Sequence, residues 1–141
     1  MRHMQKHAQG FTLLELLMVV IIIAILASIA LPQYMRVAER TRASEALTVT
    51  GAIRSSELRY RSQNPAGTYT TVLTELDIEG PGFGAPLSLM WTYAVSGAGA
   101  GSNAVATRLA GQNVGATVEV DMDGGASCSS DTDYSLPATP C

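Results

Sequence analysis

The sequence predicts an α+β protein in which one long N-terminal helix packs on a small antiparallel sheet of about three to four strands. Three observations predict this class. An uncharged apolar run extends from Leu16 to Leu31, a charged stretch with helical spacing follows to about Arg61, and short β-favourable runs separated by glycines begin near Met90. At 141 residues the chain fits one small domain with an appendage, which excludes a two-domain enzyme.

The apolar run, taken from Phe11 onward, is about as long as the 20 or so residues that a membrane-spanning helix needs. It is apolar on every side, as a membrane span is. Two basic residues, Arg2 and Lys6, precede it. The positive-inside rule would keep these residues in the cytoplasm and place the C-terminal bulk of the chain outside it.

An ordinary secretory signal peptide is the competing interpretation of this segment. A basic start, an apolar run and a small-x-small site at Ser28 and Ala30 are all present. Against it, Glu15 lies inside the apolar stretch, where a carboxylate costs about 3 kcal/mol, and a discarded peptide has no use for that charge. The helical pattern also continues past the supposed cleavage point.

Beyond the apolar run the pattern remains helical to about residue 61. Pro32 removes a backbone donor and clashes with the preceding turn, so we expect a kink or local melting there. A stripe at spacings of three and four, interrupted at Glu57, faces the rest of the protein: Ala43, Ala46, Leu47, Thr50, Ile53, Glu57 and Tyr60. Charged residues lie opposite it and predict a solvated face or a contact between subunits: Arg36, Glu39, Arg40, Arg42, Glu45, Arg54 and Arg59.

The remaining residues predict a connector and a meander of strands. Turn residues from Asn64 to Gly67 end the helix, and residues 71–77 are expected to form a short helical turn. The predicted strands are Met90 to Ser96, Ala104 to Leu109 and Ala116 to Met122. One face of the last strand carries Val118, Val120 and Met122.

The helix must supply the other side of the core, because three strands alone are marginal. We expect Leu47, Ile53 and Tyr60 to make that contact. Trp91 and Tyr93 alternate within a strand, which predicts core or strand-edge aromatic residues and no ligand site.

The string from Gly10 onward, GFTLLELLMVVIIIAILASIALPQY, closely resembles the N-terminal signal and helix of type IV pilins and type II secretion pseudopilins. The resemblance implies the pilin ladle fold. It also implies that a prepilin peptidase cuts between Gly10 and Phe11 and methylates Phe11. Glu15 matches the family's assembly glutamate and Pro32 its helix-disrupting proline, whereas Ala24 stands where many members have glycine.

By this resemblance residues 1–10 are a leader, 11–35 the membrane and filament-core half of the helix, 36–61 its amphipathic half, and 62–141 the globular head. The implied partners are other copies in a helical filament, the prepilin peptidase and an inner-membrane assembly platform. The implied location is the inner membrane first and an extracellular pilus afterwards, in adhesion, twitching motility or DNA uptake.

Two cysteines, Cys128 and Cys141, are separated by twelve residues, and export outside the cytoplasm would permit a disulfide between them. Many type IV pilins carry such a C-terminal loop, so this pair favours a pilin over a pseudopilin. The major pseudopilins of type II secretion bind calcium near the C-terminus, which raises a second possibility for one acidic group: Asp121, Asp123, Asp131 and Asp133. Solvated turn residues are the simpler interpretation of that group, so no cofactor and no metal site is predicted.

No catalytic fingerprint is present, and from Phe11 onward the chain has no histidine, so we predict no enzyme. A net charge of −3 does not indicate nucleic-acid binding. The predicted function is that of a type IV pilus subunit. The alternatives are a type II secretion pseudopilin and, in a different class, a secreted binding domain behind a cleavable signal peptide.

Overall fold

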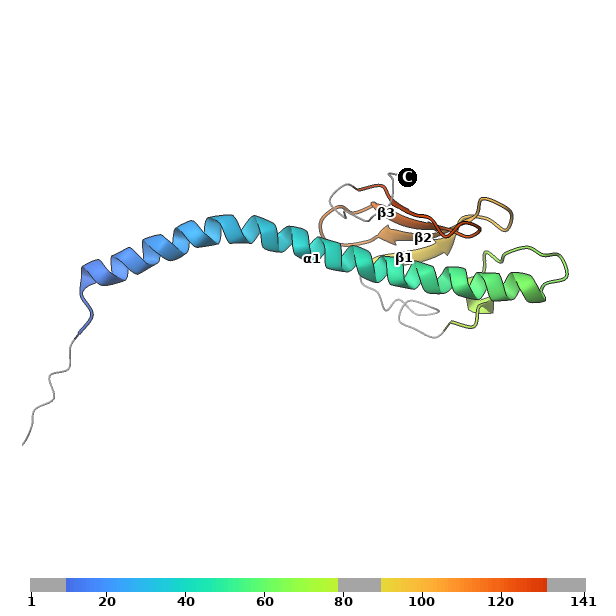
Figure 1. Ribbon diagram of the computed structural model, residues 1–141, viewed down its shortest axis with the longest axis horizontal. Helices are drawn as coiled ribbons and strands as arrows, with labels where there is room; N and C mark the ends of the chain where they lie inside the picture. Colours follow the sequence, from blue (N-terminus) through green and yellow to red (C-terminus); the bar gives the residue numbers. More distant parts are fainter. Residues whose placement is uncertain (1–9, 79–89, 132–141) are drawn as a thin grey trace, which may run out of the picture. The chain divides into compact units, whose positions relative to one another are not determined.

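The computed structural model describes residues 10–78 and 90–131 (Figure 1). The chain divides into two units, Met1–Met35 and Arg36–Cys141, and the long helix α1 belongs to both. The second unit contains the C-terminal half of α1, a short 3-10 helix and four strands. The elements are α1 (Leu13–Gln63), η1 (Leu73–Glu75), β1 (Trp91–Val95), β2 (Asn103–Arg108), β3 (Thr117–Asp121) and β4 (Ser127–Ser129).

The predicted long helix is confirmed, with both ends displaced by two residues to Leu13–Gln63. The N–H of Asn64 still donates to the carbonyl of Tyr60 at 2.9 Å, and Pro65 then prevents the helix from continuing. Pro32 lies inside α1, which is helical on both sides of it. No break interrupts the helix at that point, and the kink at Pro32 stays a prediction.

The four strands form one antiparallel sheet in the order β1-β2-β3-β4. The register places Ala106 between Tyr93 of β1 and Val118 of β3, and all three are buried. Side chains of this row therefore point to the same face of the sheet, as the period of two requires. The three predicted strands and the short turn near residues 71–77 are confirmed.

The fourth strand, β4, was not predicted individually, because Ser127–Ser129 is short and polar. It forms because a tight turn brings the chain back against β3. The N–H of Gly125 donates to the carbonyl of Asp121 at 3.0 Å, and the N–H of Asp121 donates to the carbonyl of Ala126 at 2.8 Å. Gly125 has a φ of 73°, a conformation that glycine adopts readily.

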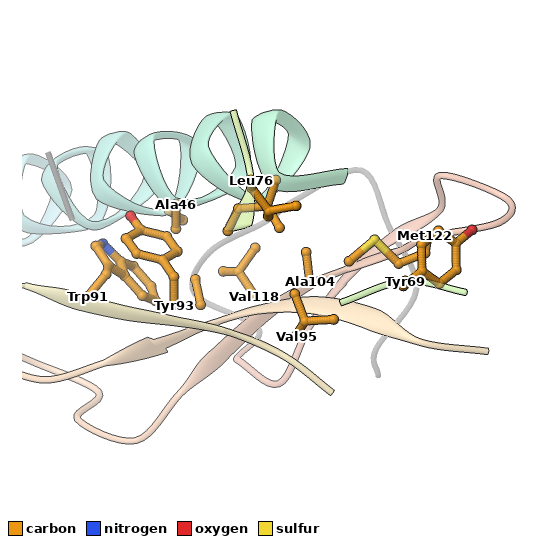
Figure 2. Packing of buried hydrophobic residues seen from close by; sticks show 12 residues of the cluster. Ala46, Tyr69, Leu76, Trp91, Tyr93, Val95, Ala104, Val118 and Met122 are labelled. Carbon is orange, nitrogen blue, oxygen red and sulfur yellow. The ribbon is translucent and has the colours of Figure 1, made fainter. Parts of the chain in front are cut away.

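The core lies between the sheet and residues 36–63 of α1 (Figure 2). Ala43, Ala46 and Ile53 of the helix are fully buried there. The small alanines let the helix approach the sheet, where the aromatic rings of Trp91 and Tyr93 fill the space, as predicted. Leu47 and Tyr60 are half-buried at the edge of the same cluster.

The prediction of a solvated charged face on the helix was wrong for two residues, which are buried or half-buried in the structure. Glu39 is only 4% exposed, and Arg54 is half-buried. Arg54 Nε donates to the carbonyls of Asp121 and Met122, at 3.1 and 3.0 Å. A long side chain on the border of a buried stripe can reach backbone acceptors that spacing along the helix does not reveal.

Glu57 interrupts the apolar stripe because its carboxylate has a structural partner. The side chain is fully buried, and Oε2 accepts a hydrogen bond from the N–H of Thr70 at 3.0 Å. Burial raises the pKa of Glu57, the hydrogen bond from Thr70 opposes that shift, and the nearby Glu75 adds to it. Glu57 thus joins α1 to the connector that follows it.

A second contact between α1 and the connector predicts a pH dependence of stability. Arg59 donates from Nε and Nη2 to Asp77 at 2.9 and 2.7 Å, and Ser56 donates to the same carboxylate. These bonds, that of Arg59 first, lower the pKa of Asp77 from 3.8 to about 2. The folded state binds this proton more weakly than the unfolded state, so the stabilisation is present above pH 3.8 and is lost as pH falls through about 2.

We therefore expect Asp77→Asn to lower the melting temperature of the full chain in detergent micelles at neutral pH. The melting curves of variant and parent should converge as the pH approaches about 2. Glu45→Gln is the matched control, because Glu45 is exposed on α1. A Tm difference that is unchanged across this pH range would contradict the assignment.

Candidate membrane and assembly segment

The first unit presents an apolar helix surface. Every described residue from Gly10 to Met35 is exposed, including a continuous set of large aliphatic side chains from Leu16 to Leu26. In the described part of the chain, α1 is the one helix long and apolar enough to cross a membrane by length and composition. None of the most apolar stretch is buried within the structure. This surface needs an apolar environment outside the chain itself.

Glu15 is the acidic residue of this segment, and it lies in the first turn of α1. Its N–H donates to Thr12 Oγ1 at 3.2 Å, so Thr12 caps the helix. The spacing Thr12-x-x-Glu15 is that of a capping box, a local signal in the sequence for the start of a helix. The position suits a carboxylate because the N-terminal end of a helix carries a partial positive charge. Among the described residues, the Glu15 carboxylate has no ion-pair partner.

The predicted cleavage site lies immediately before the helix. Gly10 and Phe11 both precede Leu13, the first residue of α1, and Phe11 is 83% exposed. The peptide bond between them is therefore outside regular structure and open to a protease. Residues 1–9 of the predicted leader, which include Arg2 and Lys6, lie outside the described residues.

In the second unit, a buried ion pair joins α1 to the sheet. Arg108, the last residue of β2, has a side chain that is 0% exposed, and its Nη2 lies 3.4 Å from Glu39 Oε2. The guanidinium carbon lies 5.1 Å from the centroid of the Trp91 ring. Glu39 also pairs with Arg42, which is partly exposed. A desolvated cation is thus held by one carboxylate and an aromatic face.

The backbone at Gly111 packs closely against the Arg108 guanidinium, so a larger residue at position 111 would clash with it. Gly111 has a φ of 95°, and an added Cβ there would come 2.8 Å from Arg108 Nη2. This pair was not among the features predicted from the sequence, although the pattern of β2 contains a signal for it. Arg108 lies on the same face of β2 as Ala104 and Ala106, so a charged residue occupies an inward-facing position of the strand.

The other end of the sheet is tied to the end of α1. Asp123 accepts hydrogen bonds from Arg61 Nη1 and Tyr69 Oη, both at 2.8 Å. These bonds and one from the N–H of Gly101 lower the pKa of Asp123, with the Tyr69 bond the largest cause. The Asp123 carboxylate therefore has a structural role, since its hydrogen bonds join the end of the sheet to the end of α1. In the described ranges 10–78 and 90–131, no three acidic, histidine or cysteine residues are grouped as metal ligands, and Asp133 lies outside these ranges.

Cys128 lies in the middle of β4 and pairs in register with Glu119 of β3. Cys141 lies outside the described residues. The disulfide between the two cysteines stays a prediction.

Comparison with known proteins identifies the N-terminal segment. Residues 5–31 match the prokaryotic N-terminal methylation motif. The chain is 46% identical over 56 residues to a type IV major fimbrial protein FimA of Dichelobacter nodosus, covering 40% of this chain and 34% of the relative. It is 45% identical over 51 residues to a fimbrial protein of Pseudomonas aeruginosa, covering 36% of this chain and 33% of that relative.

One match extends into the head. The chain is 35% identical over 105 residues to the fimbrial protein EcpC of Eikenella corrodens, which covers 74% of this chain and 64% of the relative. In contrast, the matches to the FimA protein and to the Pseudomonas aeruginosa fimbrial protein span about a third of the length of those relatives. No solved structure matches the chain at a significant level.

Proposed function

This chain belongs to the type IV pilin family, and from that premise we propose that it is the structural subunit of a type IV pilus filament on the cell surface. The observation that carries the proposal is the exposed apolar helix of residues 13–35 with a single carboxylate near its start. Such a surface requires lipid before assembly and other apolar helices after it. The curated relatives are named fimbrial proteins, which supports a pilus over a secretion pseudopilus.

We propose that a prepilin peptidase removes residues 1–10 and methylates the new N-terminus at Phe11. The match to the methylation motif spans this point, and the bond between Gly10 and Phe11 precedes the helix. Cleavage leaves a positive amine on Phe11, four residues before the Glu15 carboxylate. Both charges then lie at the same end of an apolar helix.

Each of these charges is costly in an apolar environment when it is alone. Between neighbouring subunits, the Phe11 amine of one copy and the Glu15 carboxylate of the next neutralise each other. A pair of this kind sets the axial register, because a shifted helix leaves two charges unpaired. The proposed partners are thus other copies of this chain, together with the peptidase and an inner-membrane assembly platform.

The test is mass spectrometry of the intact protein and of its N-terminal peptide, from the native membrane and from sheared surface material. The expected chain begins at methylated Phe11 and is lighter by two hydrogens if the predicted disulfide has formed. A chain that begins at Leu31 would mean a secreted domain and would contradict the proposal. Gly10→Val should retain the leader, and Ala24→Val is the control that should be processed normally.

A further inference from the structure

We propose that the β2–β3 loop, residues 109–116, rests together with Arg36 on an anionic phospholipid surface while the subunit waits in the membrane. This inference rests on the proposed function, since it assumes that the apolar segment is anchored in a bilayer. It assigns a lipid-facing surface to the head.

The first step is the position of the loop within the second unit. Arg108 directly precedes the loop, and its Nη2 lies 3.4 Å from Glu39 Oε2. Glu39 follows Arg36, the first residue of this unit, by three positions, or about 4.5 Å along a helix. The opposite end of β3 leads to Asp123, which is bonded to Arg61. The loop therefore lies at the end of the sheet where α1 enters the unit (Figure 1).

The second step is the chemistry of the loop. Leu109 and Val114 are 53% and 64% exposed, and residues 109–116 contain no charged side chain. Asn113, Gly111 and Gly115 all have positive φ, which turns the chain tightly and displays these two side chains. An uncharged tip with two exposed aliphatic side chains can enter the boundary between headgroups and acyl chains.

The third step is the level at which the bilayer surface meets the chain. Tyr34 and Arg36 follow the apolar run in sequence, and both are exposed. Tyr and Arg at the end of a span are typical of residues at the membrane–water interface. The headgroup layer on each side of a bilayer is about 5–7 Å thick. Glu39 follows Tyr34 by five residues, or about 7.5 Å along a helix, and it contacts Arg108 at the start of the loop, so the loop begins within reach of that layer.

The choice of lipid over a second copy follows from area and charge. A stable protein interface buries about 800 Å² on each partner, and this loop offers two large apolar side chains. Lipid needs no matching surface. Arg36 is exposed on the adjoining turn of α1, and an arginine near an anionic membrane strengthens the attraction to it about fivefold.

The experiment uses the full chain in vesicles of phosphatidylcholine with and without phosphatidylglycerol. A nitroxide is attached in separate variants at Val114→Cys, at Val72→Cys and at Ala24→Cys, with the unsubstituted chain as the labelling control. Val72 is the matched control, since it is an exposed aliphatic residue of the head that adjoins Thr70, the partner of Glu57. The measured quantity is relaxation of each label by a water-soluble nickel complex.

In anionic vesicles we expect the label at 114 to be relaxed about fivefold less than the label at 72. Arg36→Gln should remove most of this difference, whereas Arg36→Lys, which keeps the positive charge, should retain it. Equal relaxation at 114 and 72, with the label at 24 protected, would overturn the inference and leave the proposed function intact. Relaxation of the label at 24 would overturn both.

Two further outcomes count against the inference. If protection at 114 is the same in neutral and anionic vesicles, Arg36 does not contribute and the assignment of an anionic lipid is wrong. If protection at 114 appears in sheared filaments and is missing from vesicles, the surface belongs to a second copy of the chain.

Discussion

Replacement of Glu15 by glutamine is expected to reduce the number of surface filaments by at least about a hundredfold, because removing one member of a buried ion pair costs about 3–5 kcal/mol. Glutamine has the same size and still fits the first turn of α1. It carries no charge to neutralise the Phe11 amine of a neighbouring subunit. Electron microscopy and the quantity of sheared protein measure the effect.

The control for this prediction is Glu45→Gln, which removes an exposed carboxylate from the same helix. It should leave the filament number near that of the parent. Mass spectrometry of the membrane fraction should show that the Glu15→Gln chain still begins at Phe11, so that the defect lies in assembly. Normal filament numbers in the Glu15→Gln strain would show that this carboxylate has no part in assembly.

The largest expected effect on stability concerns the buried pair of Glu39 and Arg108. Glu39→Gln leaves the Arg108 guanidinium buried without a counter-charge, since its side chain is 0% exposed. The loss of a partner from a buried pair costs about 3–5 kcal/mol. We therefore expect the free energy of unfolding, measured with urea on the full chain in detergent micelles, to fall by about that amount.

Two variants make this measurement decisive. Glu45→Gln should change the free energy of unfolding by no more than about 0.5 kcal/mol, as exposed substitutions do. The double variant Glu39→Leu with Arg108→Met should recover most of the lost stability, because neither charge remains to be desolvated. A loss below about 1 kcal/mol for Glu39→Gln would show that the pair is solvated in the protein.

The features that the sequence predicted correctly are carried by local patterns. The uncharged run from Leu16 to Leu31 and the stripe containing Ala46 and Ile53 are visible in a few turns of helix, and the structure has one helix there. The alternation around Val118 likewise predicted which side of a strand is buried. Such patterns depend on the periods of helix and strand, which are the same in every fold.

The tertiary structure alone decided the roles of the charged residues. Glu39 precedes Ala43 by four residues and so lies on the buried face of α1, although its charge predicted a solvated position. It is buried because the end of β2 brings Arg108 against it. Strand β4 has no pattern of its own and forms because the turn after Asp121 returns the chain to the edge of β3. Burial of a charged side chain, and pairing of a short polar strand, both depend on contacts with other elements of the fold. Those contacts come from residues far away in sequence, so local sequence patterns cannot predict them.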